Sequence, residues 1–153
     1  MPEGGNAPTR VLRGGQFLSQ VVNQESRELL VLAELIQPHG RKLPLHEHEL
    51  AYVTLVLDGH YGEGTQHRFI ELRPFTAIFN PSGIAHTGLV GESGTRLFIL
   101  EFRSQLLKQL DLHLPNDRVT DPGTGALLWP GMSIFSAFKA GSMDSLVLEG
   151  HLM

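Results

Sequence analysis

Two histidines one residue apart, His46 and His48, stand directly before a run of strand-forming residues that begins at Ala51. Alternate side chains of a β-strand share a face, so both imidazoles are expected to point the same way. The same alternation, continued along the run, places Tyr52 and Thr54 on the histidine face. Imidazole, phenol and hydroxyl groups on one side of a strand indicate a side that meets water, a ligand or a metal.

The chemistry of this face has three interpretations. The imidazoles could coordinate a metal, line a pocket without a metal, or lie on the surface where the chain enters the fold. Tyr52 could instead be a core residue whose hydroxyl bonds to a backbone group. Glu47 and Glu49 fall on the opposite face, and no acid–base residue is expected beside the histidines.

Residues 10–102 are expected to form short strands separated by glycine and proline. Asp58-Gly59 predicts a hairpin turn after the run that begins at Ala51, and Gly91 is expected to end another strand. Runs of this kind at near-regular spacing are typical of an all-β sandwich or barrel. The expected strand segments are 27–36, 51–57, 67–72, 75–80, 85–90 and 95–102.

Residues 103–153 are expected to form a helical extension. Two apolar stripes have helical spacing, Gly141 suits a helix C-terminus, and Ser142 suits the start of a further helix. That last helix has no stop signal before Met153, so we expect a chain truncated before another domain. The stripes are Leu106, Leu107 and Leu110, then Ile134, Phe135 and Phe138.

Composition excludes several classes of function. The 153 residues include no cysteine, so disulfides and thiolate chemistry are excluded. The net charge of −4 and the scattered basic residues argue against DNA binding by this chain. The start lacks the apolar core of a signal peptide, and no apolar run has membrane-spanning length. We therefore expect a cytoplasmic protein with no membrane partner.

Two motifs resemble those of the cupin family. The first, G-x5-H-x-H-x3-E-x6-G, is matched in register by Gly40, His46, His48 and Gly59. The second, G-x5-P-x-G-x2-H-x3-N, is matched by Pro81, Gly83 and His86. The resemblance implies a cupin double-stranded β-helix, a jelly-roll barrel over residues 1–102, followed by C-terminal α-helices. Three motif positions depart from the family, at Tyr52, Phe75 and Val90.

The departure at Tyr52 bears on metal binding. Metal-dependent cupins generally bind through three imidazoles and a carboxylate, and Tyr52 stands where the carboxylate would be. The resemblance leaves His46, His48 and His86 to hold one divalent ion, such as zinc, iron or manganese. Affinity for that ion should fall because one anionic ligand is missing, so we expect no required cofactor.

A narrower resemblance concerns the whole pattern, from "HEHELAYVTLVLDGHY" through "FNPSGIAHTG" to "GTRLFILEF" and the helices. It is similar to the amino-terminal domain of AraC-type transcriptional regulators. It implies a non-enzymatic domain that senses a small-molecule effector, dimerises through its C-terminal helices, and meets DNA only through a domain absent from this chain. The effector could be a sugar, an aromatic acid or another metabolite, bound by His46, His48, Tyr52, Thr54 and His86.

The alternative function is a metal-dependent cupin enzyme, an oxygenase or isomerase. Its metal ligands would be His46, His48 and His86.

Overall fold

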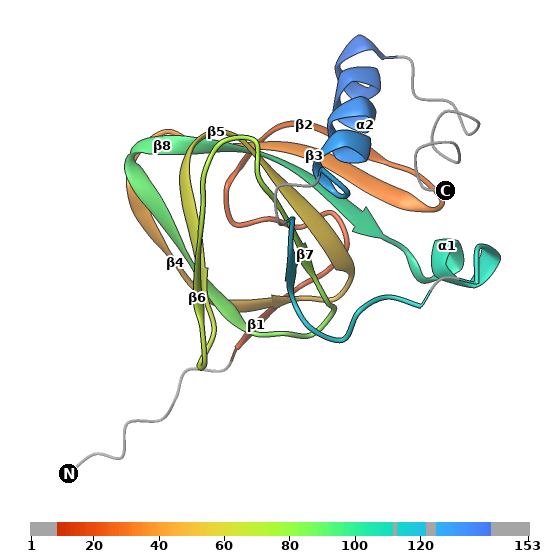
Figure 1. The fold of residues 1–153 in the computed structure, drawn as a ribbon, viewed down its shortest axis with the longest axis horizontal. Coiled ribbons are helices and arrows are strands. Elements are labelled where there is room, and N and C mark those ends of the chain that lie inside the picture. Colours follow the sequence, from red (N-terminus) through yellow and green to blue (C-terminus); the bar gives the residue numbers. More distant parts are fainter. Residues whose placement is uncertain (1–8, 112, 122–124, 142–153) are drawn as a thin grey trace.

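The computed structural model describes residues 9–111, 113–121 and 125–141, which form β-strands followed by two helices (Figure 1). The all-β expectation is therefore confirmed, and the described helices are short. The helix expected from Ser142 lies outside the described residues. The elements are β1 (Arg10–Leu12), β2 (Gln20–Ser26), β3 (Leu30–Gln37), β4 (Arg41–His48), β5 (Ala51–Gly64), β6 (Phe69–Leu72), β7 (Ala77–Asn80), β8 (His86–Phe102), α1 (Ser104–Gln109), β9 (Val119–Thr120) and α2 (Leu128–Ala140).

Two long strands, β5 and β8, connect two layers of sheet. Their halves Ala51–Asp58 and Arg96–Phe102 pair with each other, and this layer also contains β2, β3, β7 and β9. Their other halves, Tyr61–Gly64 and Thr87–Val90, pair in a second layer with β4 and β6, and β1 runs parallel to β4. The hydrogen-bonded path runs from β1 to β9 and does not close into a ring within the described ranges.

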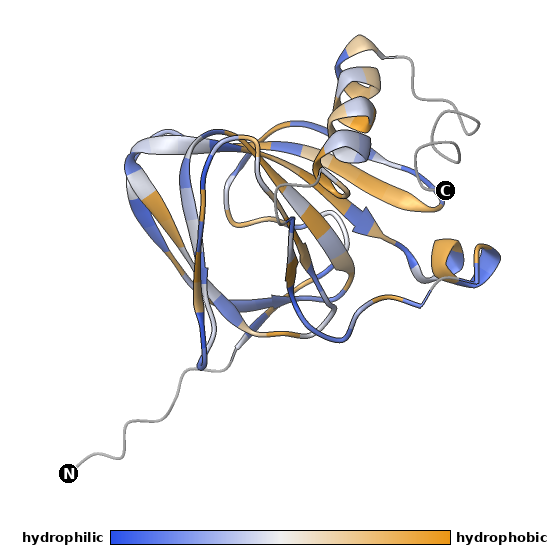
Figure 2. Ribbon diagram, in the orientation of Figure 1, coloured by the Kyte–Doolittle hydropathy of each residue, from blue (hydrophilic) through white to orange (hydrophobic). Residues whose placement is uncertain are grey.

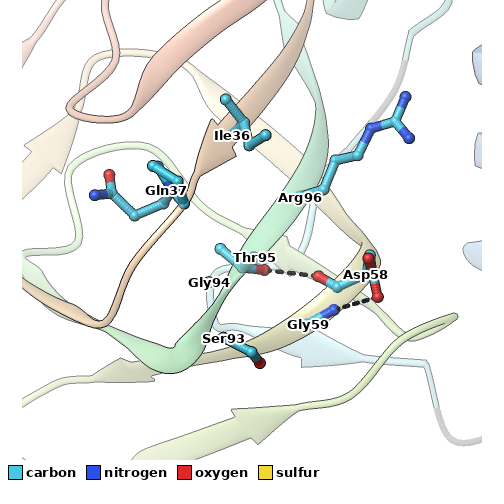
Figure 3. A pocket seen from close by; sticks show the side chains of 9 residues that line it. Ile36, Gln37, Asp58, Gly59, Ser93, Gly94, Thr95 and Arg96 are labelled. Carbon is cyan, nitrogen blue, oxygen red and sulfur yellow. Dashed lines mark hydrogen bonds between the residues drawn. The ribbon is translucent and has the colours of Figure 1, made fainter.

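The expected hairpin at Asp58-Gly59 and the expected strand end at Gly91 are both wrong. Each position lies inside a long strand that bends from one layer into the other. Gly59 and Gly94 have φ of 78° and 84°, and a Cβ on Gly59 would overlap the Gly94 carbonyl oxygen. Figure 3 shows this corner, where the Thr95 hydroxyl donates to the Asp58 carbonyl oxygen at 3.0 Å. The bend needs glycine in both strands, because only glycine permits this approach.

The outer face of the first layer is covered by the helices. Ala51, Val53 and Leu55 of β5 pack there with Ile134 and Phe138 of α2. β3 is buried on both faces, and Figure 2 shows hydrophobic colouring along most of it. The helix predicted from Ile134, Phe135 and Phe138 is present as part of α2, and Gly141 ends α2 with a left-handed φ of 68°. No described helix is long and apolar enough to span a membrane.

A buried carboxylate also joins α2 to the sheet. Glu34 of β3 is 1% exposed and accepts hydrogen bonds from Arg96 of β8 and from Lys139 of α2, the latter at 2.9 Å. Burial alone would raise the pKa of Glu34, but the Lys139 and Arg96 interactions outweigh burial and lower the pKa below its usual value. The ionised carboxylate therefore connects two strands and the helix.

The glycine corner predicts a large difference between two glycine substitutions. Gly59→Ala should lower the free energy of unfolding by about 3 kcal/mol or more, because it adds a backbone overlap to left-handed strain. Gly83→Ala is the matched control: Gly83 also has a positive φ of 77°, but nothing lies within 4 Å of its added Cβ. The control should lose only about 1–2 kcal/mol. Equal losses in urea denaturation would contradict the contact described at the corner.

Candidate functional site

The three histidines singled out by spacing come together inside the structure. His46 and His48 lie on β4, and His86 is the first residue of β8, paired in register with His46. They are 3%, 6% and 2% exposed, so the interpretation as surface histidines is wrong. One ring nitrogen from each lies within 4.8 Å of the others, and the His46 and His86 ring centroids are 4.3 Å apart.

Backbone carbonyls fix the tautomers of two of these rings. His46 Nδ1 lies 2.7 Å from the Pro44 carbonyl oxygen, and His86 Nδ1 lies 3.1 Å from the Ile84 carbonyl oxygen. A carbonyl oxygen can only accept, so each Nδ1 carries the proton and donates it. The Nε2 atoms of both neutral rings are therefore acceptors, which is the arrangement found in metal-bound histidines.

Burial keeps His46 and His86 neutral at pH 7. It lowers the pKa of His46 to about 4, against the opposing effect of the Pro44 hydrogen bond. It also lowers the pKa of His86, although the nearby Glu63 carboxylate acts in the opposite direction. Neutral imidazoles can accept a hydrogen bond or bind a cation without first releasing a second proton.

Tyr52 and Thr54 face the same interior as the histidines, as strand alternation predicts. The Tyr52 hydroxyl lies 3.2 Å from His86 Nε2, and its ring centroid lies 4.2 Å from that of His48. Since His86 Nε2 is the acceptor, the phenol donates, so its partner is an imidazole rather than a backbone group. Burial raises the pKa of Tyr52 well above its usual value, which disfavours a phenolate. Thr54 is 1% exposed.

This interior also contains four polar residues that strand alternation did not predict. Glu63, Asn80 and Glu101 are each no more than 2% exposed, and Arg118 is 9% exposed. Glu101 Oε1 lies 3.9 Å from His48 Nδ1, and Glu63 accepts a hydrogen bond from Asn80, the cross-strand partner of Tyr52, so both carboxyl groups lie near the histidine face. The expectation that no acid–base residue lies on that face is therefore wrong.

Several buried polar atoms in this interior have no hydrogen-bond partner. His48 Nδ1 lies 3.9 Å from Glu101 Oε1, beyond hydrogen-bond distance, while Glu101 Oε2 accepts from the Gly15 N–H at 2.8 Å. Each such group costs about 1–3 kcal/mol when it stays unpaired. The unpartnered atoms are His48 Nδ1, Thr54 Oγ1, Glu63 Oε1 and Asn80 Oδ1.

Surface hollows lined by described residues lie at three places away from the histidine cluster. One lies at the glycine corner (Figure 3), one lies over Leu43 and Phe69, and one lies between Leu50 and α1. The low exposure of the three rings shows that the histidine cluster is buried.

The donor set fits a divalent metal only in part. Three neutral imidazoles suit zinc or iron, and two tautomers are already fixed. Ligand nitrogens of a tetrahedral zinc ion lie about 3.4 Å apart. The three histidine nitrogens lie up to 4.8 Å from one another, so the rings would have to move closer together to bind such an ion. The Tyr52 hydroxyl also occupies His86 Nε2, one of the nitrogens that such an ion would need.

No family model and no curated protein matches this sequence. Similar solved structures include a cupin domain from Bordetella pertussis Tohama I, at 18% identity and TM-score 0.46, covering 61% of this chain and 98% of that chain. A cupin 2 conserved barrel domain protein from Leptotrichia buccalis has 16% identity and TM-score 0.49, covering 58% and 42%. The DMSP lyase DddQ from Ruegeria pomeroyi DSS-3 has 20% identity and TM-score 0.47, covering 61% and 43%. These likenesses concern the arrangement of strands and say nothing about function.

The contact between Tyr52 and His86 predicts that the phenol weakens metal binding. Tyr52→Phe should raise the affinity for Co²⁺ about three- to tenfold, because His86 Nε2 loses its hydrogen-bond donor. Calorimetry and the visible absorption of bound Co²⁺ would measure it. Tyr61→Phe is the matched control, since Tyr61 is a buried tyrosine on the same strand. A loss of affinity in Tyr52→Phe as large as in His48→Ala would contradict this account and make Tyr52 a ligand.

Proposed function

We propose that this chain is a cupin-type sensor module, the effector-binding and dimerisation part of an AraC-type transcriptional regulator. In this proposal a small molecule binds directly to His46, His48, Tyr52 and His86, with Thr54 beside them. The chain is non-enzymatic by itself, and DNA is bound only by a separate domain.

The observation that carries the proposal is the set of unpartnered polar atoms inside the fold. Well-packed interiors pair nearly all their polar groups, because an unpaired buried group is costly. Here His48 Nδ1 and Thr54 Oγ1 stay unpaired on the same interior that holds the neutral rings of His46 and His86. A ligand with complementary groups would pair these atoms and recover the free energy that their unpaired state costs.

The second support is the two-faced character of β5. Its inward residues Tyr52 and Thr54 alternate with outward residues Val53 and Leu55, which pack against α2. A Cβ added to Gly131 of α2 would lie 2.8 Å from a Leu55 methyl carbon, so the helix sits directly on the strand. A shift of β5 on ligand binding would therefore move the surface under α2.

The enclosure of the site suits a sensor. Because the three rings are 2–6% exposed, a ligand reaches them only if a covering segment moves. Ligand binding would then favour one arrangement of strands and helices over another, which is a shift in population. A dimer formed through the C-terminal helices would pass that shift to a DNA-binding domain.

A metal-dependent cupin enzyme is the second candidate. It is favoured by the fixed tautomers of His46 and His86 and by the buried carboxylates of Glu63 and Glu101 near them. Tight binding of a divalent ion by the wild-type protein would favour this candidate. Weak binding, limited by Tyr52, is what the sensor proposal expects.

The sensor proposal predicts linked changes in stability and in the environment of α2. The chain has one tryptophan, Trp129, and it lies in α2. Among monosaccharides, aromatic alcohols and aromatic acids tested at millimolar concentration, a compound that binds should raise Tm and change Trp129 fluorescence. The affinity measured from either response should fall at least about tenfold in His46→Ala or His86→Ala, since each substitution removes a ring contact with the ligand.

His67→Ala is the matched control for this experiment, because His67 is an exposed histidine outside the cluster. It should leave both responses unchanged. A compound that binds equally well to wild type, His46→Ala and His86→Ala would remove the histidines from the binding site. Binding that never alters Trp129 fluorescence would contradict the link between the interior and α2.

A further inference from the structure

A second polar group lies beside the histidines, formed by Glu63 of β5 and Asn80 of β7. Glu63 is 1% exposed and Asn80 is 2% exposed, and Asn80 Nδ2 donates to Glu63 Oε2 at 3.0 Å. Asn80 is also the cross-strand partner of Tyr52. The pair therefore lies next to the Tyr52 side of the cluster.

The free atoms of this pair are both acceptors. Glu63 Oε1 and Asn80 Oδ1 have no hydrogen-bond partner. Burial, the Glu63 charge and a hydrogen-bond interaction with the Glu63 side chain raise the pKa of Tyr61 well above its usual value, so Tyr61 lies beside this carboxylate. Oε1 nevertheless has no partner within hydrogen-bond distance. A molecule that brings hydrogen-bond donors would pair both of these buried acceptors.

Arg118 does not turn this pair into a receptor for anions. Its Nη2 donates to Thr65 Oγ1 at 3.3 Å and to the Arg68 carbonyl oxygen at 3.1 Å. Its Nη1 donates to the Glu63 carbonyl oxygen at 3.4 Å and lies 4.0 Å from Glu63 Oε2. Both terminal nitrogens therefore donate hydrogen bonds to the β5–β6 hairpin. The single positive charge of the guanidinium can neutralise only one carboxylate.

The charges of the enclosed interior do not cancel. Glu63 and Glu101 supply two buried carboxyl groups to this interior, and Arg118 supplies one guanidinium. A further carboxylate brought into this interior would meet an excess of negative charge where water screens it poorly. Hydroxyl and ammonium groups would meet acceptors instead.

We infer that Glu63 and Asn80 determine the class of ligand: a neutral or cationic molecule that presents hydroxyl or ammonium donors to Glu63 Oε1 and Asn80 Oδ1, and not a carboxylate. This inference rests on the proposed sensor function and narrows it. Among the effectors left open by the sequence, it favours polyhydroxylated molecules and amines over aromatic acids.

The test compares probes that share a carbon skeleton and differ in one group. Benzyl alcohol, benzylamine and benzoate form one set, and glucose, glucosamine and glucuronate form another. Thermal shift and calorimetry should show that wild-type protein binds at least one alcohol or amine about tenfold or more tightly than its carboxylate partner. This comparison needs no variant, so a folding defect cannot obscure it.

The variant Glu63→Gln then tests whether Glu63 causes this selectivity. It keeps the shape of the side chain and removes its charge, so amine binding should weaken about tenfold while the matching carboxylate gains affinity. Glu71→Gln is the matched control, because Glu71 is an exposed glutamate on β6, and it should change neither. Circular dichroism would show that both variants are folded.

The outcomes separate this inference from the proposed function. Carboxylates that bind wild-type protein as tightly as their alcohols or amines would overturn the inference, and so would a panel in which no hydroxyl or ammonium probe binds. If carboxylates bind and His46→Ala abolishes their binding, the sensor site survives without this selectivity. If amines bind and depend on Glu63 but not on His46 or His86, the selectivity stands and the proposed histidine site fails.

Discussion

The structure depends on two strands that each belong to both layers of the sandwich. β5 and β8 bend together where Gly59 meets Gly94, and the contact leaves no room for a side chain on Gly59. Because both strands cross the corner together, the histidines of β4 and β8, Tyr52 of one half of β5 and Glu63 of its other half face one interior. Without the shared bend, these residues would lie on separate sheets.

That interior combines buried polar residues with a hydrophobic cluster, and this combination explains the chemistry of the site. Tyr61, Val56 and Ile99 belong to a buried hydrophobic cluster that also contains Tyr52, whose ring contacts the histidines. Removal of water holds His46 neutral and makes an unpaired acceptor expensive. The same β5 residues alternate with outward ones under α2, so binding inside and packing outside are carried by one strand.

Much of the fold and part of the site could be predicted from the sequence. Strand alternation correctly placed His46, His48, Tyr52 and Thr54 on one inward face, and motif spacing correctly added His86. Strand alternation did not predict that Glu63 faces the interior, because irregular pairing near Asp58 and Tyr61 shifts the alternation within β5. The sequence also did not identify Glu101, Asn80 and Arg118, because their positions depend on long-range pairing. Glu101 has apolar neighbours on both faces of β8, and Asn80 is the last residue of a strand before a proline. Arg118 reaches the interior from a segment without periodicity.

The central claim is that the cluster is buried and that His46 and His86 are neutral, each with its proton on Nδ1 and its Nε2 atom as an acceptor. Nitrogen NMR of histidine-labelled protein reads the protonation and tautomer of each ring directly. At pH 7 His46 and His86 should both be neutral with the proton on Nδ1, and His46 should titrate only near its pKa of about 4. Rings that titrate near the ordinary value of 6.5, or that carry the proton mainly on Nε2, would contradict the enclosed cluster and the functions built on it.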